Sequence, residues 1–217
     1  MVFNMKRKEI ILGVVGIVVL VVIAFAIANL VHDYNKDIIN KQEEKEKKEQ
    51  EDEKIKVDGV EINFKTYRID QKFFLNVPDI FTKLDETTLK EKYNYNDRPE
   101  LVFMSNDDLQ HVFISTTNQD MTDDGLEDYL NYRMTGFTNM TMLESGVYQK
   151  YDKTFAKLVV TDANSYYNFR FFTLDNKLVT VEFNTPVNDY QKWEDVSEEI
   201  MDSLCFDEED IKKYSSD

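Results

Sequence analysis

Residues 166–184 read YYNFRFFTLDNKLVTVEFN, and this stretch decides the fold. Two runs of alternating, β-prone residues flank Asp175-Asn176, a pair that tolerates the left-handed backbone of a two-residue hairpin loop. The sequence therefore predicts an antiparallel hairpin of strands 166–174 and 177–184. The alternation groups side chains by face: Tyr167, Phe169 and Phe171 on one face of the first strand, and Val179, Val181 and Phe183 on one face of the second.

The opposite face of the first strand is more polar. Arg170 alternates there with Asn168 and Phe172. Because arginine is rarely buried, a surface ion pair is the expected role of Arg170.

The flanking segments predict more strands and two helices. A strand at 73–77 ends at Pro78, which cannot donate to a ladder. Further strands are expected at 101–104, 111–116, 143–150 and 154–161. Thr122 is expected to cap a helix, and the residues that this helix should bury are Leu126, Tyr129, Leu130 and Met134. A second helix follows Pro186, with apolar residues at spacings of three and four: Tyr190, Trp193, Val196, Ile200 and Leu204. This order predicts an α+β fold, an antiparallel sheet with packed helices.

The N-terminal region predicts a membrane anchor. Residues 10–28 carry no polar side chain and follow Lys6, Arg7 and Lys8. A run of this length approaches the roughly 20 apolar residues that cross a bilayer as a helix, and basic residues stay on the cytoplasmic side. Residues 1–31 are therefore expected to be a cytoplasmic basic stub and one transmembrane helix. The protein is then a single-pass protein of the cell membrane.

A cleaved signal peptide is the alternative, and it would make the protein secreted. Small residues occur in the A-x-A pattern at 24–26 and 26–28. The apolar core of a signal peptide usually runs about 7–15 residues, so the longer run here favours the anchor.

Residues 32–56 form a highly charged segment with opposite charges at helical spacing. A semi-rigid stalk is expected, with a disordered tether as the alternative. The globular part is then residues 57–217, outside the cytoplasm.

The globular part is strongly acidic. Basic and acidic residues cancel within 1–56, so residues 57–217 carry the whole net charge of −16. Such a domain is unsuited to nucleic acid, whose phosphates are bound by lysine and arginine. Cys205 is the single cysteine, so the domain has no internal disulfide. This composition is typical of a bacterial exported protein.

Four segments carry a resemblance to a known family. They are FFLNVPDIF (73–81), LVFMSNDDLQHVFIST (101–116), TDDGLEDYL (122–130) and the stretch from YYNFRFF to EEIMDSL (166–204). Together they resemble the PsbP-like superfamily, which includes the PsbP subunit of photosystem II, the Ran-binding import factor Mog and many bacterial exported proteins. The resemblance spans about residues 60–206. It implies the PsbP-like α+β fold and a binding or assembly role, and it carries over no functional residue.

Catalytic motifs are missing from the sequence. His32 follows the apolar run, and His111 shares a strand face with Phe113, where a half-buried structural role is expected. One cysteine and two histidines do not provide a zinc site of the usual spacing. The glycines form no nucleophile elbow, P-loop or dinucleotide fingerprint. We therefore expect no catalytic residue, no cofactor and no enzymatic activity.

One acidic segment matches a calcium loop in outline. Asp120, Thr122 and Asp124 occupy positions one, three and five, and Gly125 occupies position six. Position twelve is Asn131, where a calcium loop needs a bidentate glutamate. Helix capping is therefore favoured over a metal site, and Asp120 and Asp124 remain only as candidate ligands.

The segment before Pro99 is the candidate binding site. Tyr93, Tyr95 and Arg98 lie in it among amide side chains. Aromatic side chains and arginine on a loop are typical of recognition surfaces. The alternative is that both tyrosines pack over the edge of the sheet.

These features predict a membrane-anchored extracytoplasmic binding or accessory protein that recognises another envelope protein. The sequence leaves two alternatives: a module that binds a divalent cation or an envelope glycan, and a carboxylate-dependent cell-wall enzyme. It does not reveal the oligomeric state.

Overall fold

The computed structural model describes residues 54–96, 98–150 and 152–206. A compact unit begins at Ile55, which packs against the core two residues before the predicted domain boundary. The predicted transmembrane helix, nearly all of the stalk and the C-terminal tail lie outside the described residues. Within the described part, no helix is long and apolar enough to span a bilayer.

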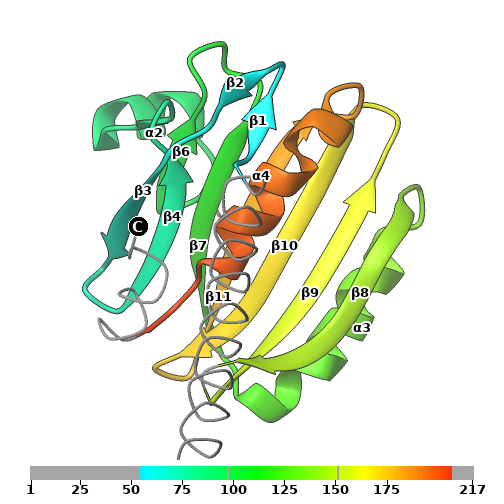
Figure 1. Ribbon diagram of the computed structural model, residues 1–217. Coiled ribbons are helices and arrows are strands. Elements are labelled where there is room, and N and C mark those ends of the chain that lie inside the picture. Colours follow the sequence, from blue (N-terminus) through cyan, green and yellow to red (C-terminus); the bar gives the residue numbers. More distant parts are fainter. Residues whose placement is uncertain (1–53, 97, 151, 207–217) are drawn as a thin grey trace, which may run out of the picture. The chain divides into compact units, whose positions relative to one another are not determined.

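The central element is a seven-stranded antiparallel sheet (Figure 1). Its order is β5-β6-β7-β11-β10-β9-β8. The bounds are β5 Thr82–Lys83, β6 Leu101–Met104, β7 His111–Asp120, β8 Thr141–Lys150, β9 Lys153–Thr161, β10 Ser165–Leu174 and β11 Lys177–Pro186. The sequence-based prediction of an antiparallel sheet is therefore confirmed, although β7 continues four residues past its predicted end.

The predicted hairpin forms the middle of this sheet. Asp175 and Asn176 have φ values of 52° and 59°, the left-handed pair that a two-residue loop requires. The loop fixes the register, so that Phe169 lies opposite Glu182. Phe169 and Phe171 pack in a core cluster with Leu126 and Leu130, while the valines of β11 pack in a separate cluster with Trp193. The two apolar sets that the alternation predicted therefore lie on opposite faces of the sheet.

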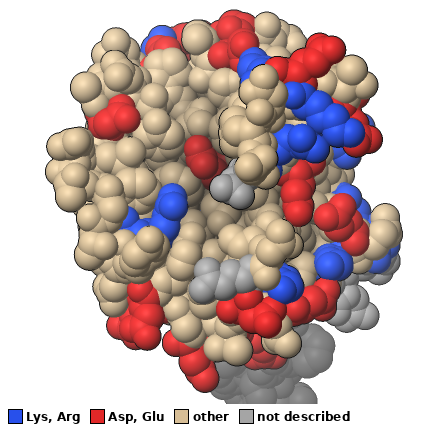
Figure 2. All heavy atoms as spheres, turned by 180° about the vertical axis from the view of Figure 1, so that it is seen from behind, with Lys and Arg blue, Asp and Glu red and all other residues tan. Residues whose placement is uncertain are grey.

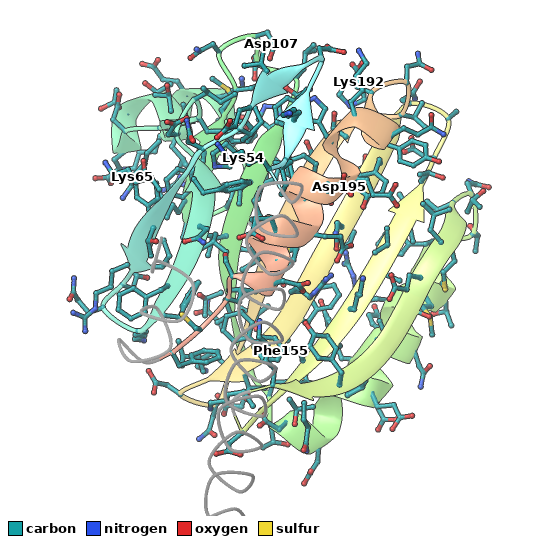
Figure 3. The ribbon with its side chains drawn as sticks, in the orientation of Figure 1. Lys54, Lys65, Asp107, Phe155, Lys192 and Asp195 are labelled. Atoms are coloured by element: carbon teal, nitrogen blue, oxygen red, sulfur yellow. The ribbon has the colours of Figure 1, made fainter. Side chains whose placement is uncertain are left out.

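One face of the sheet is covered by helix α4, Tyr190–Asp202, and by the hairpin of β3, Phe64–Ile69, and β4, Phe73–Pro78. Figure 1 shows α4 lying across β10 and β11. The strands β1, Lys56–Val57, and β2, Val60–Glu61, form a small separate ribbon. Lys192, which Figure 3 labels on α4, forms an ion pair of 3.2 Å with Asp58 in the turn between the two strands of this ribbon.

The other face carries two helices. The 3₁₀ turn η1, Asp123–Gly125, leads into α3, Leu126–Gly136, which covers β8 and β9. Of the four residues predicted to be buried by this helix, Leu126 and Leu130 are buried and Tyr129 and Met134 are half-buried. Helix α2, Glu86–Lys92, packs against the same face over β6 and β7.

Helix α2 was not among the predicted elements. It begins after Asp85, whose carboxylate accepts hydrogen bonds from the backbone N–H groups of Thr87 and Thr88, both at 2.9 Å. Only Leu89 of this helix is buried. Its short length and single buried residue give it almost no periodic signal in the sequence.

The predicted surface role of Arg170 is wrong. Its side chain is 1% exposed and lies under α4. The guanidinium donates to Glu198 at 2.9 Å, to Asn168 at 2.6 Å and to the hydroxyl of Tyr148 at 3.0 Å. These acceptors compensate the cost of burying the charge, so the polar residues of this strand face form an internal network.

Candidate functional site

A carboxylate interrupts an apolar row on the face that carries α2 and α3. Paired residues of five neighbouring strands form this row, in the order Val102, Phe113, Glu182, Phe169 and Leu158. Residues that are paired directly across strands point to the same side of a sheet. Glu182 therefore projects between two phenylalanines, at a place where either helix would normally bury an apolar side chain.

Helices α2 and α3 cover different parts of the sheet, and a hollow remains between them. We name it the Glu182 hollow. Its volume is about 300 Å³, and its described lining residues are Tyr95, Pro99, Phe113, Ser115, Glu182 and Asn184. Figure 2 views this face and shows an acidic side chain at the bottom of a hollow, with mostly uncharged atoms around it. A wider groove of about 830 Å³ adjoins the hollow and shares Tyr95, Pro99 and Ser115 with it.

The hollow changes the electrostatics of Glu182. Its side chain is half-buried, but its open side faces only the hollow, and burial raises the pKa of the Glu182 carboxyl above its usual value. A hydrogen bond from Asn184 Nδ2 to Glu182 Oε1, at 3.0 Å, and the charge of Arg133 oppose this rise. Desolvation disfavours the charged carboxylate, so any group that restores favourable contacts to it gains energy.

A chain of hydrogen bonds continues from Glu182 to the rim of the hollow. Asn184 Oδ1 lies 3.1 Å from His111 Nδ1, and His111 Nε2 lies 2.8 Å from Asp108 Oδ1. Asp108 also accepts hydrogen bonds from Lys92 of α2. The hydrogen bonds of Lys92 and His111 hold the pKa of the Asp108 carboxyl below its usual value.

The side-chain amide of Asn184 connects the two ends of this chain. Asp108 is ionised and can only accept, so Nε2 of His111 donates to it. Asn184 donates to the ionised carboxylate of Glu182 through Nδ2, while its oxygen faces Nδ1 of His111. A protonated Glu182 would instead donate to the amide oxygen, which requires the reversed orientation of the amide.

The candidate binding loop contributes one wall of the hollow. The rings of Tyr93 and Phe113 meet edge to face at 5.6 Å, and Tyr95 packs against Tyr93 at 6.3 Å. Burial raises the pKa of Tyr93 to about 12, and burial together with the charge of Glu182 raises that of Tyr95. Both hydroxyls therefore stay protonated. Tyr93 packs over the sheet, which agrees with the alternative that both tyrosines have a packing role. Tyr95, in contrast, is 53% exposed.

Arg98 lies in the adjoining groove and not in the Glu182 hollow. The structure thus brings Tyr93 and Tyr95 together near Glu182, while Arg98 lines the groove that adjoins the hollow. Tyr95 lines both depressions, and Tyr93 is not among the described lining residues of either one.

Arg133 of α3 lies near enough to Glu182 to affect its pKa, but it is not among the described lining residues of the hollow. Its guanidinium carbon is 4.9 Å from the ring centre of Phe137 and 6.0 Å from that of Phe169. Its Nε is buried and has no hydrogen-bond partner among the described residues. Although its charge lowers the pKa of Glu182, no ion pair within 4 Å joins the two side chains in the described structure.

The candidate metal ligands lie elsewhere. Asp120 ends β7 and forms an ion pair of 2.6 Å with Lys177, and Asp124 lies in η1. Among the described residues, no group of three or more histidine, cysteine, aspartate or glutamate side chains is placed to hold a metal ion. Thr122 precedes η1 as expected, although its side chain forms no capping hydrogen bond.

Sequence reasoning missed Glu182, and a signal for it exists. Glu182 alternates with Val181 and Phe183, so it resembles an ordinary solvent-facing residue. A two-residue loop, however, pairs Glu182 with Phe169, which belongs to the aromatic face of the neighbouring strand. A carboxylate opposite a phenylalanine in the middle of a hairpin is the pattern that marks this position.

Comparisons with known proteins show the fold. No known protein family and no curated protein matches the chain. Among solved structures, the solution structure of cyanobacterial PsbP (CyanoP) from Synechocystis sp. PCC 6803 is similar, with a TM-score of 0.51 and 12% identity, over 66% of this chain and 92% of that one. The predicted PsbP-like fold is therefore confirmed.

Two further structures align more loosely. A Pseudomonas aeruginosa protein of unknown function, PA94, described as a putative regulator, has a TM-score of 0.38 and 10% identity, over 66% of this chain and 96% of that one. A Bacteroides thetaiotaomicron VPI-5482 protein has a TM-score of 0.37 and 13% identity, over 67% of this chain and 49% of that one.

Proposed function

We propose that this chain, whose domain has the PsbP-like fold, is a membrane-anchored extracytoplasmic binding protein that recognises another envelope protein. The apolar run at 10–28 is the anchor, and the charged segment that follows holds the domain away from the bilayer. The domain acts as an accessory subunit and not as an enzyme. It docks its partner on the face of the sheet that lies between α2 and α3.

The observation that carries this proposal is the Glu182 hollow. The cost of placing a carboxylate between Phe113 and Phe169 is not repaid by an ion pair within the described structure, so the arrangement disfavours folding. Buried carboxylates with a raised pKa are found mainly at sites that bind ligands or substrates.

The shape of the face supports a protein partner. The hollow opens into the wider groove beyond the loop of Tyr95, so an extended segment has room to continue past the hollow. Exposed aromatic residues and arginine are enriched at protein interfaces, and Tyr95 and Arg98 border this groove. The net charge of −16 favours a basic partner surface, because it raises the rate at which cationic surfaces meet the domain.

In-cell photo-crosslinking tests the proposal. A photo-reactive phenylalanine analogue is placed at Tyr95, and in a matched variant at Tyr132, which is 73% exposed on α3. We expect one envelope protein to be captured from intact cells by the Tyr95 variant and not by the Tyr132 variant. The same background from both positions would overturn the proposed docking face. A melting temperature raised by millimolar calcium would instead favour the cation-binding alternative.

A further inference from the structure

One oxygen of the Glu182 carboxylate faces the hollow without a partner. Oε1 accepts the hydrogen bond from Asn184, while Oε2 accepts none in the described structure. Among the described lining residues, Glu182 is the only charged one. The floor of the hollow therefore offers one negative charge, on a carboxylate that has one oxygen without a hydrogen-bond partner in the described structure.

We propose that the Glu182 hollow binds a primary ammonium group, the side chain of a lysine presented by the partner protein. This names the ligand chemistry of the docking face and rests on the proposed function. The lysine ammonium donates to Oε2, and its aliphatic chain lies along the wall that Phe113 and Tyr95 form.

The charge of Glu182 favours a cation in the hollow. A carboxylate in a partly desolvated hollow gains more from a counter-ion than one on an open surface, because the local dielectric constant is lower. Arg133 does not fill this role, since its guanidinium packs over Phe137 and Phe169. The acidic domain also concentrates cations near its surface.

The aromatic lining of the hollow also favours a cation. Phe113 is paired directly with Glu182, and Tyr95 forms part of the same wall. Cations are attracted to aromatic faces within about 6 Å, and more strongly when water is excluded. Carboxylate and rings together therefore favour a cation attached to an alkyl chain.

Geometry favours ammonium over the other cations. A guanidinium binds best to a carboxylate through both oxygens, and the hydrogen bond from Asn184 already takes one of the two accepting positions of Oε1. Calcium takes six to eight oxygen ligands. The described lining offers too few oxygen ligands. The side-chain oxygen of Asn184 faces His111, and the side chains of Phe113 and Pro99 contain no oxygen. The volume of about 300 Å³ is at the small end for ligand sites, in keeping with one side chain.

The test uses n-butylammonium chloride as the probe. It is titrated into the full-length protein in detergent micelles, and the amide resonances of Phe113, Ser115 and Asn184 are followed by NMR. We expect saturable shifts with n-butylammonium, weaker ones with n-butylguanidinium and none with n-butanol. Equal shifts with n-butanol, or a stronger response to calcium chloride, would overturn the proposal.

Two matched variants complete the test. Glu182→Gln keeps the size and the hydrogen-bonding ability of the side chain and removes its charge, and we expect roughly tenfold weaker binding or more. Glu194→Gln makes the same change on the exposed side of α4, on the opposite face of the sheet, and should bind the probe as the unchanged protein does. If Glu182→Gln binds equally well, the proposal is wrong. Capture of a partner through Tyr95 would then still support the docking function, so the two failures are distinguishable.

Discussion

His111 and Asn184 are paired directly across β7 and β11, and His111 Nδ1 lies 3.1 Å from Asn184 Oδ1. This contact joins the surface pair of Lys92 and Asp108 to the carboxylate of Glu182. A change in the charge of Glu182 therefore changes which hydrogen-bond arrangement of Asn184 is favoured. Binding of a cation in the hollow favours the ionised carboxylate and, with it, the arrangement in which Asn184 donates to Glu182.

The unoccupied protein should be stabilised by Glu182→Gln at neutral pH. The folded-state pKa of Glu182 lies above its unfolded value, so the folded protein binds more protons in the window between the two values. Stability consequently falls as pH rises through that window and stays low above it. The glutamine variant lacks this loss, and we expect it to melt at a higher temperature at pH 7.

The gain should shrink as the pH is lowered towards about 4, near the unfolded pKa of glutamate. Melting curves of the full-length protein, followed by the fluorescence of its single tryptophan, Trp193, measure this difference. Glu194→Gln serves as the control and should show no such pH dependence. A glutamine variant that is less stable than the parent at pH 7 would show that the carboxylate is well compensated in the free protein.

The buried pair of Arg170 and Glu198 should be needed for stability. Arg170 is 1% exposed, and Glu198 Oε2 lies 2.9 Å from its guanidinium. Glu198→Ala leaves a buried cation with a weaker partner, Asp202, at 3.7 Å. We expect the free energy of unfolding to fall by about 2–3 kcal/mol. This is less than the roughly 3–5 kcal/mol lost when a fully buried ion pair is broken, because Glu198 is 32% exposed.

Urea unfolding followed by Trp193 fluorescence gives this free energy. Glu194→Ala removes a carboxylate from the same helix at an exposed position and should change it by no more than about 0.5 kcal/mol. Equal effects of the two variants would mean that the Arg170 network adds nothing beyond an ordinary surface contact.

The hairpin loop should discriminate between substitutions at Asn176. This residue is exposed and has a φ of 59°, a left-handed conformation that β-branched residues disfavour. Asn176→Val should lower the free energy of unfolding by about 1–2 kcal/mol, whereas Asn176→Gly should leave it unchanged or raise it. The two variants are compared by urea unfolding. A valine variant as stable as the glycine variant would indicate that the loop adopts another conformation in solution.

The sequence predicted the sheet well because its signals are local. The hairpin loop at Asp175-Asn176 and the alternation of the flanking strands both act over a few residues, and the structure has them as predicted. Helix α4 was equally readable, since its apolar stripe packs on a single face. Helix α2 was missed because it is held by its cap at Asp85 and by one buried leucine.

The candidate site was only partly readable, because burial of a polar residue depends on which helix lies above it. Arg170 and Glu182 occupy similar positions in the middle of their strands. Arg170 is paired with Val181 and Glu182 with Phe169, so the two side chains lie on opposite faces of the sheet. Arg170 is enclosed by α4 and its acceptors, while Glu182 lies where neither α2 nor α3 reaches. Neither strand taken alone distinguishes the two cases, and the signal for Glu182 appears only when the hairpin pairs it with Phe169. The loop of Tyr93 and Tyr95 was singled out by its composition, and the structure places Tyr95 at the hollow, while the binding role of the loop stays a prediction.

The hydrogen bond from Asn184 should set the pH at which the hollow accepts a cation. Binding of n-butylammonium requires ionised Glu182, so affinity should fall as pH decreases through the folded-state pKa of that carboxyl. The Asn184 hydrogen bond lowers this pKa, and Asn184→Ala removes it. The variant's binding profile should therefore lie at higher pH than the parent's. Asp195→Ala, an exposed change on α4, is the control and should leave the profile unmoved. If Asn184→Ala also leaves it in place, Asn184 does not stabilise the charged form of Glu182.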